Sequence, residues 1–449
     1  MKNIKQILSA FLLFVMLMFV VSCNNDGAGE VSDTNDDSVE STDNGLENTP
    51  PDVDDELDIG VPTTVGGTKY KSTYDAYDNT TMLYWDSVTV DAATSYGSEL
   101  LGMGYTVYQN TDNSSIWSTT YTKDEGYVHV YYLKKLSEFR VLVSDSSALP
   151  QSYTQGEPLC NISVTQLGID EANPVEGMGY IIRLEDESFV IVDGGSHANG
   201  DATELYNRLA EMNGAKEKIT VRAWFFTHSD LDHYGVLMPF MEKYSNVIDV
   251  EMIVANDAHN DIYSQLGATA GSISFSKLEG KFGGAKYVKA HTGQAFNFAG
   301  LQMNILYTHE DANDLSTTSI HSRTSMVFDA VFGNERIIWL GDIEKDGAEH
   351  LVAMYGDDLA CTMLQITGGA TMGSDTLYKK CAPQTLFYAA SKSIADTSVN
   401  DAKDAYIIAN SNKVVYSYEK TMTMSFSDEV NIDGANGSVD ENQKYTENY

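Results

Sequence analysis

The amino-acid sequence predicts an α+β protein in which a small folded unit precedes a larger domain. Residues 67–147 contain short aromatic-rich strands, separated by turns with Asn, Asp and Gly, and one amphipathic helix. In residues 160–426, strands alternate with helices. A group of His and Asp side chains follows the apolar run 221–226, which indicates a site at the end of a buried strand.

The first 23 residues have the composition of a bacterial lipoprotein signal peptide. Lys2 and Lys5 precede the apolar run 7–21, which is short for a transmembrane helix. The run ends at Ser22-Cys23, which looks like a lipobox, so we expect Cys23 to be acylated and to become the mature N-terminus. The protein is then expected to be lipid-anchored at the bacterial cell membrane and extracytoplasmic. An uncleaved anchor helix is the alternative and gives the same location.

Residues 24–66 are predicted to be an acidic, disordered linker. Thirteen acidic residues lie between Asp26 and Asp58, and the whole segment has no Lys or Arg. Such a segment repels itself and has too little apolar surface to fold, so it serves as a spacer. The tail, residues 427–449, is also polar and acidic, and is expected to be disordered.

The charge of the chain argues against general nucleic-acid binding. Its formal net charge is −37, from 28 Lys and Arg against 65 Asp and Glu. Sequence-independent binding to DNA or RNA depends on neutralising phosphates, and Lys and Arg nowhere cluster in this sequence. A metal ion in an acidic protein can still supply the positive charge that a phosphoester needs.

The small unit, residues 67–147, is predicted to have the order β-α-β-β-β-β. Its helix is expected at residues 90–104, with Asp91 as N-cap and Ala93, Tyr96, Leu100 and Leu101 on one side. Its Tyr and Trp content is explained by packing on both faces of a sheet; a glycan-binding face is the alternative. The strands are expected at residues 81–85, 105–108, 116–122, 127–132 and 139–144.

The larger domain is predicted to contain many short strands, four helices and a hairpin closed by Gly333-Asn334. Asp201 and Glu204 have the spacing of a capping box at the first helix. The helices are expected at residues 202–213, 234–244, 347–354 and 374–381. The strands are expected at residues 164–167, 179–184, 188–192, 221–226, 250–255, 274–277, 286–290, 301–307, 325–332, 336–340, 363–366, 385–389, 414–418 and 421–426.

Four side chains able to bind a metal lie within six residues after the strand 221–226. His228, Asp230 and Asp232 alternate, so an extended backbone points them the same way, and His233 must come from the following turn. Imidazole and carboxylate together suit zinc, manganese or iron(II). Carboxylates buried this densely repel one another unless a cation neutralises them, which favours bound metal.

This run resembles the signature Thr-His-x-His-x-Asp-His-x-Gly of the metallo-β-lactamase superfamily. Asp230 stands where most members have a second His, a departure similar to that in the hydrolase domain of DNA-uptake competence proteins. Two further motifs carry the resemblance: residues 189–195, which end in Asp193-Gly194-Gly195, and residues 338–342, which end in Asp342. The resemblance covers the larger domain and implies a four-layer αββα sandwich.

The resemblance also implies a ligand set. His228, Asp230 and Asp342 would bind a first metal, and Asp232, His233 and Asp342 a second, while Asp193 would be structural. It implies a metal-dependent hydrolase of phosphoester or related ester bonds in a small or polymeric substrate, with Asp232 also catalytic. Zinc is the favoured cofactor and manganese the alternative, with one or two ions bound.

One departure weakens the second metal site. The competence-protein subgroup has a His-His-Gly turn after the strand that follows the bridging Asp, whereas this chain has Thr367-Gly368-Gly369. His321 is the first choice as a substitute ligand, followed by His259 and His309, although a solvated loop His is the plainer interpretation of each. Arg323 is a candidate for binding a substrate anion. The alternative function is therefore a degenerate metallo-β-lactamase-fold protein of the cell envelope that acts as a binding or structural scaffold.

The cysteines leave their pairing open. Apart from Cys23, the chain has Cys160, Cys361 and Cys381, an odd number, and no Cys-x-x-Cys pattern that would indicate a thiolate zinc site. Cys361 and Cys381 are able to pair if the fold brings them together. Buried free thiols are the favoured interpretation.

Overall fold

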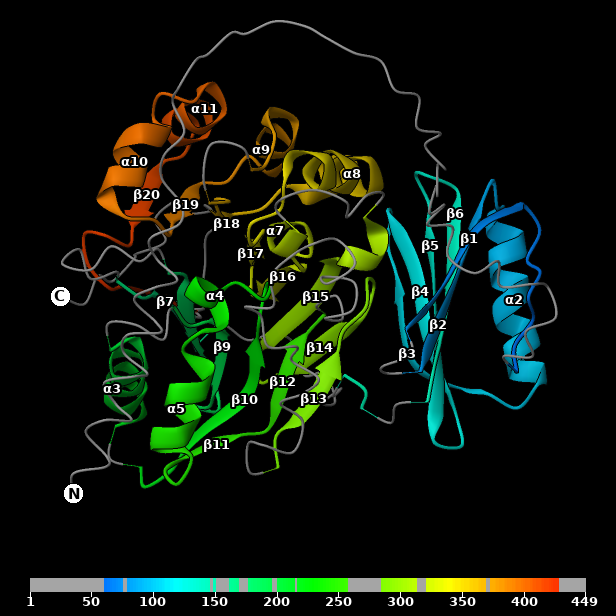
Figure 1. Ribbon diagram of the computed structural model, residues 1–449, viewed down its shortest axis with the longest axis horizontal. Helices are drawn as coiled ribbons and strands as arrows, with labels where there is room; N and C mark the ends of the chain where they lie inside the picture. Colours follow the sequence, from blue (N-terminus) through cyan, green and yellow to red (C-terminus); the bar gives the residue numbers. More distant parts are fainter. Residues whose placement is uncertain are drawn as a thin grey trace, which may run out of the picture. The chain divides into compact units, whose positions relative to one another are not determined.

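The computed structural model describes residues 60–75, 79–145, 148–150, 161–168, 177–195, 200–214, 216–256, 284–312, 320–368 and 372–427 (Figure 1). The predicted signal peptide with Cys23, the strand 274–277, Cys160, His259 and the tail beyond residue 427 lie outside these ranges. In the part of the chain that the model describes, every helix is too short or too polar to cross a membrane.

The first sheet is antiparallel throughout, and within the described residues its strand order is β1-β2-β6-β5-β4-β3. The strands are β1 (Thr68–Asp75), β2 (Thr80–Asp86), β3 (Thr106–Asp112), β4 (Ile116–Lys123), β5 (Gly126–Leu133) and β6 (Glu138–Ser144). One helix, α2 (Val90–Gly102), follows β2. The predicted order is therefore found, with one addition: the edge strand β1 was not predicted.

The helix α2 packs on one face of the first sheet, and the residues between them form an apolar core. Ala93, Tyr96 and Leu100 are buried as the spacing predicts, but Leu101 is half exposed. The predicted N-cap Asp91 is wrong: Thr89 caps the helix, and its hydroxyl accepts a hydrogen bond from the amide of Ala92 at 3.2 Å. The same core includes Val61 and Val65, which the sequence analysis assigns to the linker.

The second and third sheets form the larger part of the described chain. The second has the order β13-β12-β10-β9-β8-β7-β21 with β11 beside β10, and the third has the order β14-β15-β16-β17-β18-β19-β20. The second contains β7 (Asn161–Gln166), β8 (Gly179–Arg183), β9 (Phe189–Asp193), β10 (Ile219–Phe225), β11 (Ile248–Val250), β12 (Met252–Ala255), β13 (Lys286–Lys289) and β21 (Met422–Ser427). The third contains β14 (Ala295–Phe298), β15 (Leu301–Tyr307), β16 (Val327–Phe332), β17 (Glu335–Trp339), β18 (Met363–Gln365), β19 (Thr385–Tyr388) and β20 (Lys413–Tyr416).

These two sheets pack face to face, with helices on their outer faces (Figure 1). The core between them is apolar, and a second apolar layer lies under the helices of each sheet. The helices are α3 (Asp201–Asn213), α4 (Leu231–Tyr234) and α5 (Leu237–Tyr244) beside the second sheet, and α8 (Lys345–Tyr355), α9 (Asp375–Cys381), α10 (Lys392–Ser398) and α11 (Ala402–Asn410) beside the third. The four-layer αββα order implied by the resemblance is confirmed.

In the larger domain, one helix cap and one helix length were predicted wrongly. The capping box of Asp201 and Glu204 is absent, because the N-cap of α3 is Gly200, whose φ of 84° lies in the left-handed region and which has no side chain to bond the helix. The predicted helix 234–244 is two helices, α4 and α5, with a break at Gly235 and Val236. The strand β14 and the helices α10 and α11 were not predicted.

Candidate metal centre

The strands β9 and β10 run parallel and end at the same edge of the second sheet. Asp193 is the last residue of β9, and His228 follows β10 by three residues. Asp342 follows β17 of the third sheet in the same way. The amide of Met326, just before β16, donates to the carbonyl oxygen of Thr227 at 2.7 Å, which ties the two sheets together at this edge. Residues from distant parts of the chain therefore meet here.

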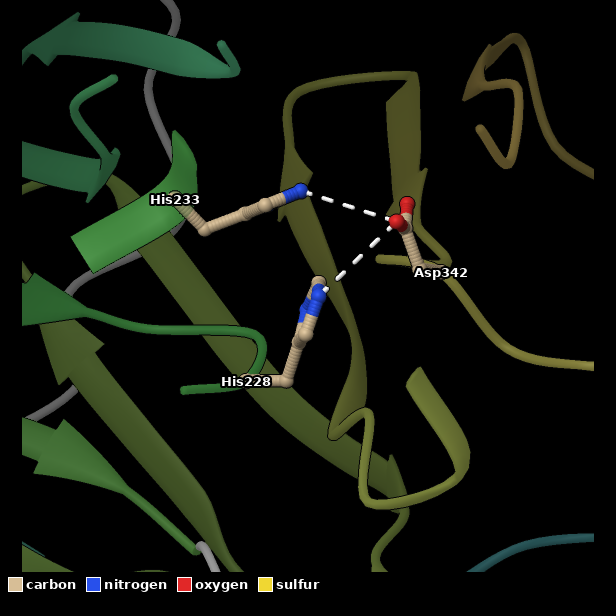
Figure 2. Close-up of side chains that lie close together, drawn as sticks. All are labelled: His228, His233 and Asp342. Atoms are coloured by element: carbon tan, nitrogen blue, oxygen red, sulfur yellow. Dashed lines mark ion pairs between the residues drawn. The ribbon is translucent and has the colours of Figure 1, made fainter. Parts of the chain in front are cut away.

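His228, His233 and Asp342 form the centre of the site (Figure 2). One ligand-type atom from each lies within 4.8 Å of the other two. Both Nε2 atoms face the same carboxylate oxygen: Asp342 Oδ2 is 3.8 Å from that of His228 and 3.7 Å from that of His233. Both rings are buried, and Asp342 is partly buried. The arrangement has space for one ion between the three groups.

Asp230 and Asp232 each lie beside one of the two histidines. Asp230 Oδ2 is 3.4 Å from Nε2 of His228, and Asp232 Oδ2 is 3.8 Å from Nε2 of His233. Each His thus has its own carboxylate, and Asp342 is common to both. This is the grouping that the resemblance implies for a first and a second metal site.

Asp193 holds the ring of His233 directly and that of His228 through Thr227. Its buried carboxylate accepts hydrogen bonds from the amide of Thr227 at 2.8 Å, the hydroxyl of Thr227 at 2.7 Å and Nδ1 of His233 at 2.8 Å. Asp193 adopts a φ of 49°, in the left-handed region, which turns the chain at the end of β9. Its carbonyl oxygen also accepts from the indole of Trp224 at 2.7 Å. Asp193 therefore contacts the site through Thr227 and His233.

The hydrogen bonds assign the tautomers of both rings. Because the Thr227 hydroxyl gives its proton to Asp193, it can only accept from Nδ1 of His228, 3.0 Å away. His233 donates its own Nδ1 proton to Asp193. In a neutral ring, Nε2 then carries a lone pair, and in both residues that atom faces Asp342. Histidines that bind metals are commonly oriented in this way.

The charges of the site perturb its pKa values. Burial alone would lower the pKa of His233, but Asp232, Asp342 and Asp193 outweigh it and raise the value to about 10. Burial raises the pKa of Asp232, and Asp342 adds to the rise. For Asp230, burial acts in the same direction, but nearby His228 outweighs it and the pKa is lowered. The negative charge of the carboxylates therefore favours a positive charge at this position, either a proton on His233 or a cation.

Nε2 of His228 lacks a hydrogen-bond partner, and a cation at this position would bind it instead. Nε2 of His228 is buried and makes no hydrogen bond, although a buried polar atom normally has a partner. Its surroundings are carboxylate oxygens of Asp230 and Asp342 at 3.4 and 3.8 Å. Imidazole nitrogens and carboxylate oxygens are together the donor set of zinc, manganese and iron(II) sites.

The turn before Asp342 is fixed by two polar side chains that were not predicted from the sequence. Gln365 Oε1 accepts from the amides of Leu340 at 2.8 Å and Gly341 at 2.9 Å. Ser325 Oγ accepts from the amide of Asp342 at 3.0 Å. Neither contact has a local sequence signal, because the partners lie 17 to 25 residues apart.

The loop after β18 contributes contacts but no metal ligand among its described residues, Thr367 and Gly368. The Thr367 hydroxyl is paired with that of Tyr378 at 2.9 Å. The amide of Gly368 donates to Asp342 Oδ1 at 3.3 Å, and a Cβ at this position would lie only 3.1 Å from the same oxygen. Because Gly368 has no Cβ, its backbone can approach the carboxylate of Asp342.

The other predicted candidates lie at the margin of the site or away from it. His321 is on the short helix α7 (Ile320–Arg323), and its Nδ1 is 3.3 Å from Ser229 Oγ. Its charge interacts with that of Asp230, but it is not one of the three grouped ligands. His309 Nδ1 is 3.4 Å from the carbonyl oxygen of Asn256. Arg323 pairs with two carboxylates, Glu344 at 2.8 Å and Asp346, so the structure gives its guanidinium a different role from anion binding.

Several solved structures are similar to this chain at low sequence identity. No curated protein matches the chain. In the solved structures, the metallo-beta-lactamase fold protein YhfI from Bacillus subtilis has 13% identity and a TM-score of 0.37, over 57% of this chain and 96% of its own. Yeast PDE1 has 12% identity and a TM-score of 0.38, over 60% of this chain and 100% of its own. CmlA, a diiron beta-hydroxylase from Streptomyces venezuelae, has 10% identity and a TM-score of 0.37, over 60% of this chain and 55% of its own.

The match to a protein family is more direct. Residues 173–308 match the family model described as the metallo-beta-lactamase superfamily. That segment includes Asp193, His228, Asp230, Asp232 and His233, while Asp342 lies beyond it. The chain therefore contains a metallo-β-lactamase superfamily domain.

Proposed function

We propose that this protein is a metal-dependent hydrolase that acts on phosphoester or related ester bonds. The observation that carries the proposal is the convergence of His228 and His233 on one oxygen of Asp342, at 3.8 and 3.7 Å. The buried, unbonded Nε2 of His228 supports it, because this atom gains a partner when a cation is bound.

His228, His233 and Asp342 would hold the ion, with Asp230 and Asp232 as further ligands. A divalent cation would supply Lewis acidity there, since it polarises an ester oxygen and acidifies water. Of the two flanking acids, Asp232 is the one that the resemblance assigns to catalysis, and it would also act as the proton acceptor. We assign Asp232 Oδ2, which lies beside Nε2 of His233, as the atom that takes a proton from the attacking water.

The metal and the location follow from the sequence and are part of the proposal. Zinc is favoured because two imidazoles and a carboxylate are a common zinc donor set, and manganese is the alternative. The ending Ser22-Cys23 of the N-terminal apolar run supports a lipid anchor at Cys23 and an extracytoplasmic location. The net charge of −37 supports small or polymeric ester substrates over general nucleic-acid binding.

Metal content and hydrolysis, measured together, test the proposal. We expect purified protein to contain zinc or manganese at one or two ions per chain by elemental analysis, and to hydrolyse bis(p-nitrophenyl) phosphate. Asp342→Ala removes the carboxylate common to both His residues, so we expect it to lose the metal and about 100-fold or more in rate. Asp249→Ala is the matched control, because Asp249 is exposed and its ion pair, with surface Lys218 at 3.0 Å, lies on the second sheet away from the ligands.

The result that contradicts the proposal is also specific. Protein that contains no metal as isolated, and gains no activity on added zinc or manganese, would not be a metal-dependent hydrolase. An Asp342→Ala variant that keeps both its metal and its rate would show that the site lies elsewhere.

A scaffold without catalysis is the second candidate, and one observation favours it. The loop at Thr367 and Gly368 places a hydroxyl against Tyr378 and a backbone amide against Asp342, instead of an imidazole. If the protein is a scaffold, a double variant of His228→Ala and Asp232→Ala should keep the melting temperature of the wild type. A fall in melting temperature on treatment with EDTA would exclude this candidate, since it shows that metal binding stabilises the native state.

A further inference from the structure

Two cysteines that are distant in sequence lie side by side next to the third sheet. Cys361 precedes β18 by two residues, and Cys381 is the last residue of α9. The amide of Cys361 donates to the carbonyl oxygen of Cys381 at 3.0 Å, and Sγ of Cys361 is 3.6 Å from the same oxygen. Both carry free thiols in this structure.

The backbone around the pair is fixed by further hydrogen bonds. The amides of Gln384 and Thr385 both donate to the carbonyl oxygen of Thr362 at 3.0 Å. Thr362 is in turn held by Arg336, whose carbonyl oxygen accepts from its amide and its hydroxyl, each at 3.0 Å. The packing of the chain therefore makes the two cysteines neighbours, with the amide and the Sγ atom of Cys361 both against the carbonyl oxygen of Cys381.

This geometry suits a disulfide. A direct backbone hydrogen bond between two residues places their Cα atoms within the range of roughly 4.4 to 6.8 Å that disulfides span. The Sγ atom of Cys361 already points toward residue 381. The two thiols are therefore close enough along the backbone for a cross-link to be proposed.

We propose that Cys361 and Cys381 are a modification site, at which the two thiols are oxidised to a disulfide by a low-molecular-weight disulfide or a thiol–disulfide oxidoreductase. Cys361 is partly exposed and Cys381 is fully buried, so Cys361 reacts first. Its thiolate attacks the reagent RSSR, forms a mixed disulfide and releases one RS⁻. The thiolate of Cys381 then attacks the sulfur of Cys361 and releases the second RS⁻. Two protein thiols are oxidised, RSSR is reduced to two RSH, and the protons balance.

The burial of the two thiols favours a stable structural disulfide over a catalytic redox pair. Burial raises the pKa of the Cys361 thiol, and neighbouring Cys381 raises it further, so little thiolate is present at neutral pH. We therefore expect slow formation of the bond and little reaction with alkylating reagents in the native state. A fast, repeatedly cycling redox pair would have an exposed thiol with a low pKa.

The cross-link would act on the loop beside the candidate metal centre. The segment 361–381 contains β18, then Thr367 and Gly368, and then α9. Gly368 donates to Asp342, and Tyr378 of α9 pairs with Thr367. A disulfide closes this segment into a loop and reduces the conformational freedom of the unfolded chain. We expect a rise in melting temperature on the order of 5 °C.

Peptide mapping of the purified full chain tests the proposal. The protein is incubated with oxidised glutathione at pH 8, its remaining thiols are alkylated under denaturing conditions, and it is digested without reductant. We expect one linked species that joins the peptides of Cys361 and Cys381, lighter by two hydrogens than their sum. Cys160 is the internal reference and should not be linked to either. The melting temperature should rise with this species, and in Cys361→Ser and Cys381→Ser it should not respond to oxidation.

Two outcomes would overturn the proposal. One is recovery of both peptides as separate alkylated or glutathionylated species after prolonged oxidation. The other is a linkage of Cys160 to either residue. Both are read from wild-type protein, so the decision does not depend on the folding of the serine variants. Neither outcome depends on metal content or hydrolysis, so this proposal can fail while the proposed function holds.

Discussion

At the scale of single residues, the candidate site depends on backbone conformations that few side chains allow. Asp193 and Gly341 both have positive φ, 49° and 56°, and each stands at a strand end directly beside a ligand or its support. Asp193 can adopt this conformation because its carboxylate is held by Thr227 and His233. Gly341 has no side chain, and that lets it lie against the neighbouring strand end.

Gly341→Ala tests how tightly Asp342 is positioned. An added Cβ would lie 2.9 Å from Cβ of Thr227 and 3.1 Å from Oγ of Ser325, at a φ that disfavours alanine. Thr227 supports both imidazoles and Ser325 bonds the amide of Asp342, so neither can move freely. We expect a loss of about 2–3 kcal/mol in the free energy of unfolding by urea titration, and reduced metal content.

The matched control for this variant is Gly104→Ala. Gly104 also has a positive φ, 89°, but an added Cβ there meets nothing within 4 Å. It should therefore cost only the backbone strain of about 1 kcal/mol and leave metal binding unchanged. Equal losses in the two variants would show that crowding at Thr227 and Ser325 is unimportant.

At the scale of elements, the sequence predicted what short-range patterns determine. The strands β9, β10, β16 and β17 have buried apolar runs, and Gly333-Asn334 marks the hairpin between β16 and β17. Periodicity and turn residues were therefore sufficient to predict these elements. The strand β1 was missed because its sequence is polar and half exposed, as edge strands often are. The capping box predicted for α3 is absent because sequence spacing does not show which residue is the N-cap. The N-cap is Gly200, so Asp201 is already the first residue of the helix.

The candidate site was predictable in part for a similar reason. His228 to His233 form a local group after a strand, and their residue types alone indicate a metal. Asp342 lies more than 100 positions later and was assigned through the resemblance. The supports Ser325 and Gln365 are side chains of ordinary polar type whose partners are distant, so neither local pattern nor residue type identifies them.

One short element joins the first sheet to the rest of the chain through a buried charge. Asp311 ends the turn η2 (His309–Asp311) that follows β15, and its carboxylate pairs with Arg140 of β6. It also accepts hydrogen bonds from Tyr131 at 3.0 Å and Thr292 at 2.5 Å. Arg140 and Asp311 are both almost fully buried, so each depends on the other for neutralisation.

Asp311→Ala should therefore be strongly destabilising. It leaves Arg140 buried with Glu138, at 2.7 Å, as its remaining carboxylate partner, and the expected loss is about 3 kcal/mol in the free energy of unfolding. The measurement is a urea titration followed by tryptophan fluorescence. Asp112→Ala is the control, because its pair with Lys134 is exposed and worth less than about 1 kcal/mol. A loss no larger than that of the control would show that the buried pair does not hold the sheet in place.

At the scale of the whole molecule, the same region is rich in buried histidine. His129 of β5 has Nδ1 2.9 Å from the hydroxyl of Thr120 and Nε2 2.9 Å from the carbonyl oxygen of Thr292. His291 lies between Tyr127 at 2.9 Å and the carboxylate of Glu310, also at 2.9 Å. For Glu310, burial acts to raise the pKa, but His291 outweighs it and the value is lowered. The contacts between the first sheet and the rest of the chain thus depend on groups whose charge changes in acid.

This dependence predicts how the stability of the native state changes with pH. Burial, with a smaller contribution from His291, lowers the pKa of His129 from 6.5 to about 3. Between these two values the unfolded chain binds a proton at this residue and the folded chain does not. Stability from His129 is therefore fully present above pH 6.5 and is lost as the pH falls toward 3, with a slope approaching 1.4 kcal/mol per pH unit, about one proton.

His129→Gln isolates this contribution, because glutamine keeps a polar side chain of similar reach but does not titrate. Urea titrations at several pH values between 6.5 and 4 should show a shallower decline in the free energy of unfolding for the variant than for the wild type. The self-repulsion from a net charge of −37 changes equally in both proteins, so it cancels in the comparison. The variant should be less stable at pH 7, where it lacks the two imidazole hydrogen bonds, and the difference should narrow in acid. If the free energy of unfolding declined in parallel for the two proteins, the pKa of His129 in the folded state would be close to its ordinary value, and this contact would be open to water.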